Sequence, residues 1–517
     1  MAKLTRDVLV VGGGHNGLVA ATLLARSGLS VLVAEQSEQL GGAVRTEYPF
    51  ERAPELGVSS GAYLLGLMPP KLLRLLDLQL PLLRRDPHYF LPTSGERYLL
   101  LGSGQARSRQ QLARFFCEQD WRAHEALQAE LGDLREDIAP SWLAEPLSIE
   151  ETAERYVRPP LREVFVQLCR GSIRTYLDRF GFRSDLIKAM YAVTDAFTGV
   201  FGAWDTPGTG MNFLIHNMCR LPASDGTWML LRGGMGVLTE QLARLAGDLG
   251  VEIWTSRRVV SLRTAQGVCR GAVLADGSEV TASAVVVNAD PFRLRQLAGA
   301  ASFPAAYNQR LDDCARPGSS MKVNLALRGL PEFSCLKEDL GQHRGTIHLL
   351  ADESEVIAAL DKAFQQARAG ELPEQPAMEL YIHTALDSSL KDSKGRHSAA
   401  LFVQWVPYAL KASSWEVQEQ PYVQHLLSLW ERLAPGSAGL VDDVFTLTPP
   451  KIEQRFGMTG GHIHHIDNTF GFADRLPYTT PVEGLYSASA GCHPGGSVIG
   501  AAGHNAAARL LRDLGKG

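Results

Sequence analysis

The chain begins with two apolar runs separated by a glycine-rich turn. Residues 7–11 (DVLVV) are almost continuously apolar, which is typical of a parallel strand buried on both faces. The turn at 12–17 (GGGHNG) follows at once, then the helical run 18–27 (LVAATLLARS) and a second apolar strand at 30–34 (SVLVA). This order of elements predicts a β–α–β unit of about 30 residues.

The turn has the G-x-G-x-x-G spacing of a dinucleotide-binding fingerprint. We expect Gly12 to allow the tight turn, Gly14 to let the backbone approach a pyrophosphate, and Gly17 to let the helix pack closely on the strand. Free N–H groups at the start of the helix, which carries His15 and Asn16, are expected to hold the phosphates. The sequence therefore predicts a bound dinucleotide.

The residues after the second strand favour FAD over NAD. Glu35, followed by Gln36, can accept hydrogen bonds from the hydroxyls of an adenosine ribose. Gly41, Gly42 and Arg45 then form another turn, whose glycines leave room for a cofactor and whose guanidinium can approach the pyrophosphate. Such a doublet is found in FAD proteins of the glutathione-reductase type. A surface turn with a solvated arginine is the alternative.

A second glycine-rich turn lies near the other end of the chain. Residues 485–490 (LYSASA) predict a short strand, and a turn and a helix of small residues follow it. We expect Gly491, Ser497, Val498 and Ile499 to lie at the flavin, because a helix N-terminus stabilises the electron density that the N1–C2 region gains on reduction.

The middle of the chain changes pattern twice. Leucine-rich helical stretches dominate from Gly61 to about Arg220, and strands return after residue 231 with an Asp276-Gly277 hairpin signal. The backbone of Val259 is expected to be available to the adenine ring. The predicted fold is α/β, with a Rossmann-type, glutathione-reductase-like FAD-binding domain, a mixed sheet-plus-helix substrate domain and a helical insertion. Its segments are FAD-binding residues 1–60, 231–300 and 446–517, a helical substrate or cap region at 61–230, and a substrate domain at 301–445.

The composition and net charge argue against some classes of protein but do not identify the class to which the chain belongs. The 517 residues carry a net charge of −5 without a long basic patch, which argues against a nucleic-acid partner. The first residues show no signal-peptide core, and no window is apolar enough for a transmembrane helix. The seven cysteines are scattered without a CxxC pair, as in reduced cytosolic proteins. We expect a cytoplasmic protein, with peripheral membrane contact and a homodimer left open.

With both ends considered, the chain resembles the phytoene desaturase and carotenoid isomerase group of FAD oxidoreductases, which are relatives of the amine oxidases. The run 491–507 (GCHPGGSVIGAAGHNAA) is the most specific part. Residues 447–464 (LTPPKIEQRFGMTGGHIH), the GGMG turn at 233–236 and the N-terminal unit favour a subgroup named after a pyridine nucleotide–disulfide oxidoreductase domain. The resemblance implies a discontinuous FAD domain, a substrate domain and a peripheral membrane contact. The sequence itself supports neither a redox disulfide nor a second nucleotide fingerprint, since Thr239 replaces the third glycine.

Two histidines are candidates for catalysis. Flavin dehydrogenation needs a hydride placed against N5 and often a base. His493, inside the C-terminal glycine turn, is expected to orient the substrate or to transfer a proton. In the related group the segment around His464 skirts the flavin, so His464 is expected to line the site, with a hydrogen-bonded structural histidine as the alternative. The spacing of His462, His464 and His465 lacks a further ligand, so no metal is predicted.

Together these features predict an FAD-dependent oxidoreductase, a dehydrogenase or oxidase of the desaturase type. It would take hydride from an apolar small molecule or lipid and pass electrons to oxygen or a quinone. Two alternatives stay open at this point: a redox-neutral isomerase that uses reduced FAD, and a non-catalytic flavin-bound regulatory protein.

Overall fold

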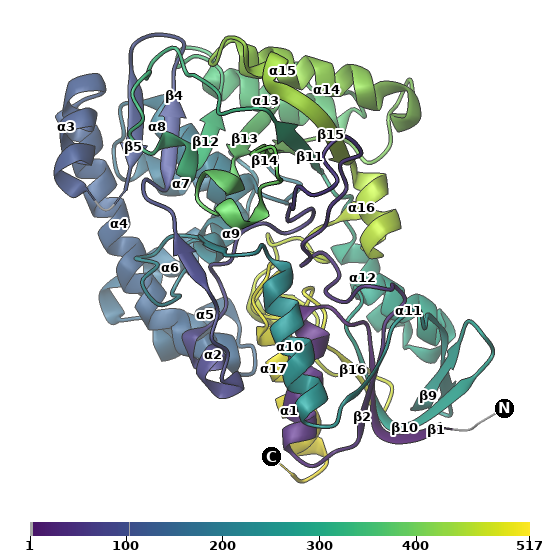
Figure 1. Ribbon diagram of the computed structural model, residues 1–517. Coiled ribbons are helices and arrows are strands. Elements are labelled where there is room, and N and C mark those ends of the chain that lie inside the picture. Colours follow the sequence, from purple (N-terminus) through teal and green to yellow (C-terminus); the bar gives the residue numbers. More distant parts are fainter. Residues whose placement is uncertain (1–3, 103, 517) are drawn as a thin grey trace.

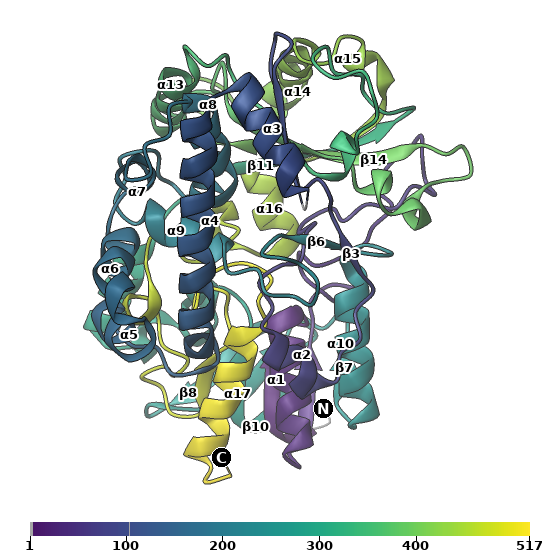
Figure 2. The ribbon, with the colours of Figure 1, turned by 90° about the vertical axis from the view of Figure 1, so that its left-hand side faces the viewer.

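Two β-sheets, set apart in the molecule, organise the chain (Figure 1). The computed structural model describes residues 4–102 and 104–516. The first sheet lies in the lower part of Figure 1, near both termini, and the second lies in the upper part. A mostly helical region, coloured blue, lies along one side of the molecule (Figures 1 and 2).

The first sheet has the strand order β7-β2-β1-β10-β9-β8, and β16 pairs with β10. Strands β7, β2, β1, β10 and β16 are parallel, whereas β10, β9 and β8 form an antiparallel meander. The bounds are β1 Leu4–Val11, β2 Val31–Ala34, β7 Glu252–Trp254, β8 Val259–Ala265, β9 Val268–Leu274, β10 Glu279–Val287 and β16 Leu485–Ser487.

Strand β1 shows how this sheet is buried on both faces. Val8 and Val10 belong to one apolar core, and Leu9 and Val11 belong to the core on the other side. Helices α10, α1 and α17 lie side by side over the first face (Figures 1 and 2), and α11 contributes to the second core. The bounds are α1 His15–Arg26, α10 Gly236–Asp248, α11 Pro291–Ala298, α12 Ala305–Cys314 and α17 Ala501–Asp513.

Strand β10 joins segments that are far apart in the sequence. It pairs with β1 from end to end, with β9 through Glu279–Thr281, and with β16 through Val285–Val287. The first sheet therefore assembles from the N-terminal unit, the middle of the chain and the C-terminal run.

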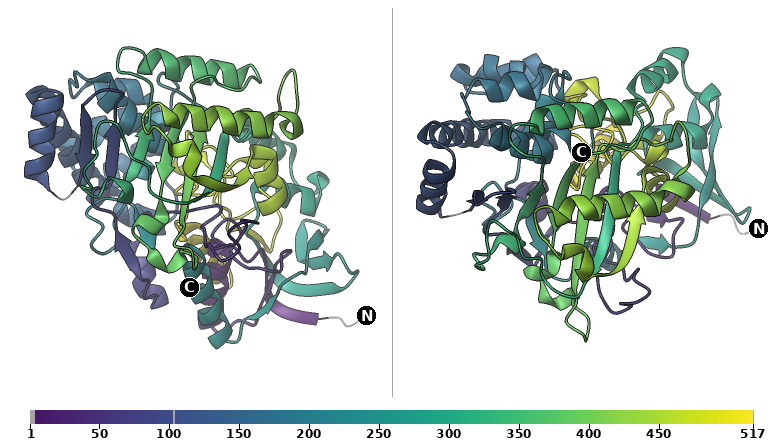
Figure 3. Two further views of the ribbon diagram at one scale, coloured as in Figure 1. Left: turned by 45° about the horizontal axis from the view of Figure 1, so that its top comes forward. Right: turned by 90° about the horizontal axis from the view of Figure 1, so that it is seen from above.

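The second sheet has the order β15-β11-β14-β13-β12-β4-β5. Successive side chains of β11 point to opposite faces of this sheet. Met321, Val323 and Leu325 pack in the apolar core beneath α14, whereas Lys322 and Asn324 belong to the opposite face. Helix α14 crosses the outer face of the sheet (Figure 3). The bounds are β4 Tyr89–Pro92, β5 Tyr98–Leu101, β11 Ser320–Leu327, β12 Thr346–Leu349, β13 Ala377–Tyr381, β14 His397–Gln404, β15 Val441–Leu447, α13 Val356–Arg368, α14 Trp415–Glu431, α15 Ser437–Leu440 and α16 Pro449–Phe456.

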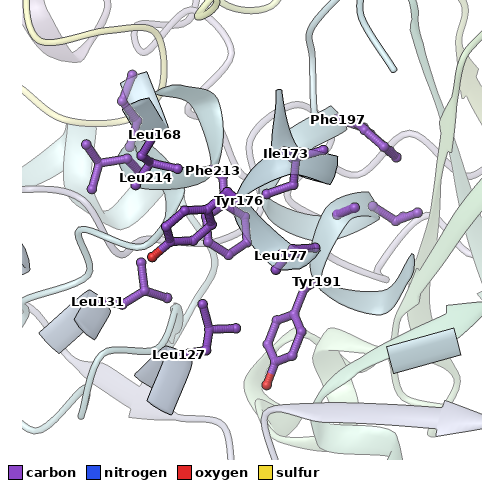
Figure 4. Packing of buried hydrophobic residues seen from close by; sticks show 14 of the residues in the cluster. Leu127, Leu131, Leu168, Ile173, Tyr176, Leu177, Tyr191, Phe197, Phe213 and Leu214 are labelled. Atoms are coloured by element: carbon purple, nitrogen blue, oxygen red, sulfur yellow. The ribbon is translucent and has the colours of Figure 1, made fainter. Parts of the chain in front are cut away.

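The helical region packs around a core of large apolar side chains, among them Leu127, Leu131, Tyr176 and Phe213 (Figure 4). Three of its helices, α5, α7 and α8, begin after serine caps, and Ser148 forms a reciprocal capping box with Glu151. The bounds are α2 Pro70–Leu76, α3 Gln105–Phe115, α4 Glu118–Ile138, α5 Ile149–Tyr156, α6 Arg162–Arg170, α7 Ile173–Asp178, α8 Asp185–Tyr191, the π-helical turn η3 Ala192–Phe197 and α9 Thr209–His216.

The predicted α/β class and Rossmann-type unit are confirmed, with local differences. Segment 61–230 is mostly helical, yet it also supplies β4 and β5 to the second sheet and the small ladder of β3 (Leu82–Arg84) with β6 (Met229–Leu231). Strands β12 and β15, which the sequence patterns did not indicate, complete that sheet. Within the described ranges, no helix combines the length and apolarity needed to cross a bilayer.

Candidate functional site

A cavity of about 730 Å³ lies between the glycine turns of the first sheet and the polar face of the second. Its volume is in the range of small-molecule and cofactor sites. The glycine-turn side is lined by Gly12, Gly14, His15, Asn16, Glu35, Gln36, Gly41, Gly42, Arg45, Val259, Ser497 and Val498. The other side is lined by Tyr63, Arg85, Thr194, His216, Trp228, Lys322, Tyr381 and Phe402.

The first glycine turn has the predicted geometry. Gly12 has a φ of 99°, which favours glycine, and a Cβ on Gly14 would lie 2.8 Å from Nδ2 of Asn288. Gly17 does not line the cavity. A Cβ on Gly17 would lie 2.2 Å from the carbonyl oxygen of Gly12, so this glycine permits the close approach of α1 to β1.

Glu35 is fixed at the end of β2. Its carboxylate accepts hydrogen bonds from the backbone N–H of Gly13 at 2.7 Å and of Ser37 at 2.8 Å. Each oxygen keeps further lone pairs for ligand hydroxyls. Gln36 and Val259 line the same end of the cavity, where the sequence places the ribose and the adenine.

Several buried polar atoms at this end have no partner among the described residues. They are Nε of Arg45, Nε2 of His15 and Oδ1 of Asn16. Burial lowers the pKa of Arg45, and its one side-chain hydrogen bond within the described residues is a 3.3 Å contact from Nη2 to the hydroxyl of Ser37. Because an unpaired buried guanidinium is costly, these atoms fit a polar, anionic ligand such as the pyrophosphate of FAD.

The C-terminal turn reaches the same cavity. Ser497 and Val498 line it, whereas Gly491 and Ile499 do not. A Cβ on Gly503 would lie 2.1 Å from the backbone oxygen of Asn16, so α17 and α1 touch through their small residues. Segments from both ends of the chain therefore meet at one site.

Arg475, which the sequence analysis did not single out, holds this turn in place. Its guanidinium is buried and donates to the carbonyl oxygens of Gly491, Cys492 and Ala490. It also donates to backbone and side-chain oxygens of the preceding loop, residues 466–470. No local pattern marks such a residue, because its partners are backbone atoms.

The inner end of the cavity is polar, which sequence reasoning also missed. Lys322 donates to the carbonyl oxygens of Ser59 at 2.5 Å and Gly61 at 2.9 Å, and Nζ lies 4.3 Å from the ring centroid of Tyr63. Burial lowers the pKa of Lys322 well below its usual value. The signal in the sequence was the strand alternation of β11, which puts a lysine on a face with no solvent.

Two buried carboxyl groups, those of Glu379 and Asp195, lie near the inner end of the cavity. Glu379 accepts a hydrogen bond from the hydroxyl of Tyr381 at 3.1 Å and another from Thr194, which belongs to the π-helical turn η3. Burial raises the pKa of Glu379 to about 7 and that of Asp195 to about 8. Such π-helical turns are frequent at functional sites, and this one carries the cavity-lining Thr194.

The two candidate histidines differ in position. His464 lines the cavity, its Nδ1 has no partner among the described residues, and burial lowers its pKa well below the usual value. His493 does not line the cavity: its Nε2 lies 2.9 Å from the carbonyl oxygen of Ser141, and its ring lies 5.3 Å from that of Phe472. The cavity therefore supports His464 as a site residue, and the catalytic role of His493 stays a prediction without such support. No three His, Cys, Asp or Glu side chains within residues 4–102 and 104–516 gather as a metal site.

Backbone N–H groups of the GGMG turn at residues 233–236 already donate to other protein groups. The N–H of Gly236 donates to the hydroxyl of Thr46 at 3.0 Å, and the N–H of Met235 donates to that of Ser59 at 3.0 Å. These donors are not available to a phosphate, which agrees with the incomplete fingerprint.

A Rossmann-type sheet, two glycine turns on one cavity and unpaired polar atoms beside the first of these turns are the features of an FAD-dependent oxidoreductase. Comparison with known proteins agrees. Residues 17–347 match the family model described as flavin containing amine oxidoreductase. The chain belongs to this family, and FAD is its cofactor.

Individual relatives extend the likeness over nearly the full length. The chain is 32% identical to pyridine nucleotide-disulfide oxidoreductase domain-containing protein 2 of Mus musculus, covering 98% of this chain and 94% of that one. It is 25% identical to all-trans-zeta-carotene desaturase of Myxococcus xanthus, covering 99% and 94%. An oxidoreductase from Methanosarcina mazei has the same fold, with a TM-score of 0.63 and 16% identity over 98% of this chain and 100% of that one. The resemblance inferred from the sequence is confirmed.

Proposed function

We propose that the protein removes hydride from a small molecule with an apolar body and passes the electrons to oxygen or a quinone. The observation that carries this proposal is the continuity of the cavity. Gly14 and Arg45 at the cofactor end and Tyr63, Tyr381 and Phe402 at the inner end line one space. A substrate at the inner end would therefore lie against the cofactor.

The inner end offers apolar contact through aromatic rings. The ring centroid of Tyr63 lies 4.6 Å from that of Tyr381 and 6.1 Å from that of Phe402, and Leu64 lines the same end. Flat apolar walls of this kind hold and orient a carbon skeleton. The name of the bacterial relative, a carotene desaturase, supports an apolar substrate.

The cavity also contains side chains that could accept a proton from the substrate. FAD, when bound, supplies the hydride acceptor. Lys322 and His464 both line the cavity, and burial favours the neutral form of each. A neutral amine or imidazole can accept the proton that leaves with the hydride, so these two residues are the proposed proton acceptors.

The test is anaerobic reduction of the FAD-loaded protein by a panel of hydrocarbons, alcohols and amines, followed by oxygen or a quinone. We expect at least one compound to bleach the flavin band and one acceptor to restore it. If a compound were converted only after chemical reduction of the flavin, and no electron acceptor were consumed, the protein would instead be an isomerase. A flavin inert to every compound would favour the regulatory alternative.

A further inference from the structure

Arg85 is a buried cation at the inner end of the cavity, and no acidic side chain among the described residues lies within ion-pair distance of its guanidinium. It follows β3, its side chain is 2% exposed, and it lines the cavity. Nε donates to the carbonyl oxygen of Trp228 at 2.9 Å, and Nη1 donates to the hydroxyl of Thr346 at 2.8 Å. Within the described part of the chain, no carboxylate forms an ion pair with it and Nη2 donates no hydrogen bond.

A fully buried guanidinium without a counter-ion is unfavourable unless a ligand supplies one. The guanidinium has five N–H donors in a fixed plane, and the two bonds to Trp228 and Thr346 leave three of them unused. That arrangement fits the two oxygens of a carboxylate.

The charges around Arg85 agree with this reading. Glu379 is a buried acidic group whose charge interacts with that of Arg85, and burial raises the pKa of Glu379 to about 7. Glu379 is therefore only partly ionised near neutral pH and compensates the guanidinium only in part. Burial also keeps the nearby histidines His88, His348 and His383 neutral, because it lowers their pKa values to about 3.

From this geometry we infer that the inner end is a carboxylate subsite, with Arg85 binding the carboxylate of a substrate whose apolar body lies between Tyr63, Tyr381 and Phe402. This inference rests on the proposed function and narrows it to apolar monocarboxylates. A single guanidinium matches one negative charge, so a phosphate dianion should bind less well.

The experiment uses the FAD-loaded protein and two probes of nearly equal shape, benzoate and benzamide. Binding is followed through the perturbation of the flavin absorbance, since the subsite and the cofactor share one cavity. We expect benzoate to bind at least about tenfold more tightly than benzamide, the ratio typical of a hydrogen bond to a charged group. Phenyl phosphate should bind more weakly than benzoate.

Three variants locate the effect. Arg85→Gln should reduce the benzoate-to-benzamide ratio to near one, and Arg85→Lys should restore part of it. Arg135→Gln is the control, because Arg135 is a half-buried arginine whose Nε donates to the carbonyl oxygen of Asn217, outside the cavity lining. It should leave the ratio unchanged.

Equal binding of benzoate and benzamide by the unaltered protein would overturn the inference, and so would the failure of both probes and of octanoate to bind. This comparison needs no variant, so misfolding of Arg85→Gln would not rescue the idea. Tighter binding of phenyl phosphate would assign the subsite to phosphates instead. In each of these cases FAD content and flavin reduction by other compounds would still test the proposed function separately.

Discussion

Gly14 and Gly17 of the first turn are needed because a side chain at either position would collide with neighbouring atoms. Gly14→Val would place side-chain atoms against Asn288 and into the space where we predict the pyrophosphate of FAD. We expect the purified variant to fold but to contain little or no flavin, measured as absorbance per polypeptide. Gly247→Ala in α10, where a Cβ meets nothing within 4 Å, is the control. A yellow Gly14→Val protein with full FAD content would refute the assignment.

Glu35 contributes a charge as well as two acceptor oxygens. Glu35→Gln keeps the size of the side chain but removes the charge and one acceptor, so hydrogen bonds from the ribose and from Gly13 or Ser37 are weakened. We expect FAD to bind more weakly by about 1.5–3 kcal/mol, as for hydrogen bonds to a charged group. Titration of the apoprotein with FAD measures this. The exposed Glu38→Gln should have no effect, and an unchanged affinity in Glu35→Gln would move the ribose elsewhere.

At the scale of elements, the loop before the C-terminal turn depends on one side chain. Arg475→Met would leave the carbonyl oxygens of Gly491, Cys492 and Ala490 without their donor. Each buried unsatisfied group costs about 1–3 kcal/mol, so we expect the free energy of unfolding to fall by at least about 3 kcal/mol and FAD to be lost more easily.

Urea unfolding of the FAD-saturated protein is the measurement for Arg475→Met. Arg509→Met, which removes a half-exposed ion pair with Asp513 on α17, serves as its control and should cost less than about 1 kcal/mol. Equal losses in the two variants would mean that the buried guanidinium has no special role.

Elements with strong local patterns were predictable, and those defined by distant partners were not. The unit β1–α1–β2 and the strand and helix at the C-terminus follow from apolar runs and glycine spacing in adjacent residues. Strand β15 has two buried residues and two adjacent acids, so its pattern is weak until β11 pairs with it. Strands β4 and β5 lie among helical segments in the sequence and join the sheet through β12.

The site residues divide in the same way. Gly12, Gly14, Glu35 and Arg45 are marked by spacing within one motif. Arg85 becomes meaningful only when Thr346, some 260 positions later, is brought to its guanidinium. A single sequence shows that a lysine or an arginine lies on a strand or turn, but it does not show which other segments surround it.

For the whole molecule, buried histidines and acids set opposite limits on stability against pH. Burial lowers the pKa values of several buried histidines to about 3 or 4, among them His15, His88, His216, His348, His383, His465 and His493. Their folded pKa values lie below the unfolded value, so their contribution is present above pH 6.5 and lost as pH falls toward 4.

Glu379 and Asp195 have the opposite sign, because their folded pKa values of about 7 and 8 exceed the unfolded values. Their contribution is present at low pH and is lost as pH rises through 7 to 8. Each unit of pKa shift corresponds to about 1.4 kcal/mol, and the histidines outnumber the acids. We therefore expect a maximum of stability near pH 6 to 7, with a steeper fall on the acid side.

Urea midpoints of the FAD-saturated protein between pH 4.5 and 8.5 measure this profile. Glu379→Gln should flatten the alkaline limb and steepen the acid limb, because the contribution of Glu379 is lost between its unfolded pKa of 4.5 and its folded pKa of about 7. A midpoint that rises steadily up to pH 8.5 would contradict the expectation.

The strand β10, paired at one end with β9 and at the other with β16, has a consequence for how the protein is made. Until residues 485–513 have left the ribosome, Val285–Val287 pair with β1 on one side but lack β16 on the other, and α1 lacks α17 at its side. A nascent chain can complete the N-terminal nucleotide unit early, but it cannot enclose the flavin. Acquisition of colour would therefore be a late event that reports on completed synthesis.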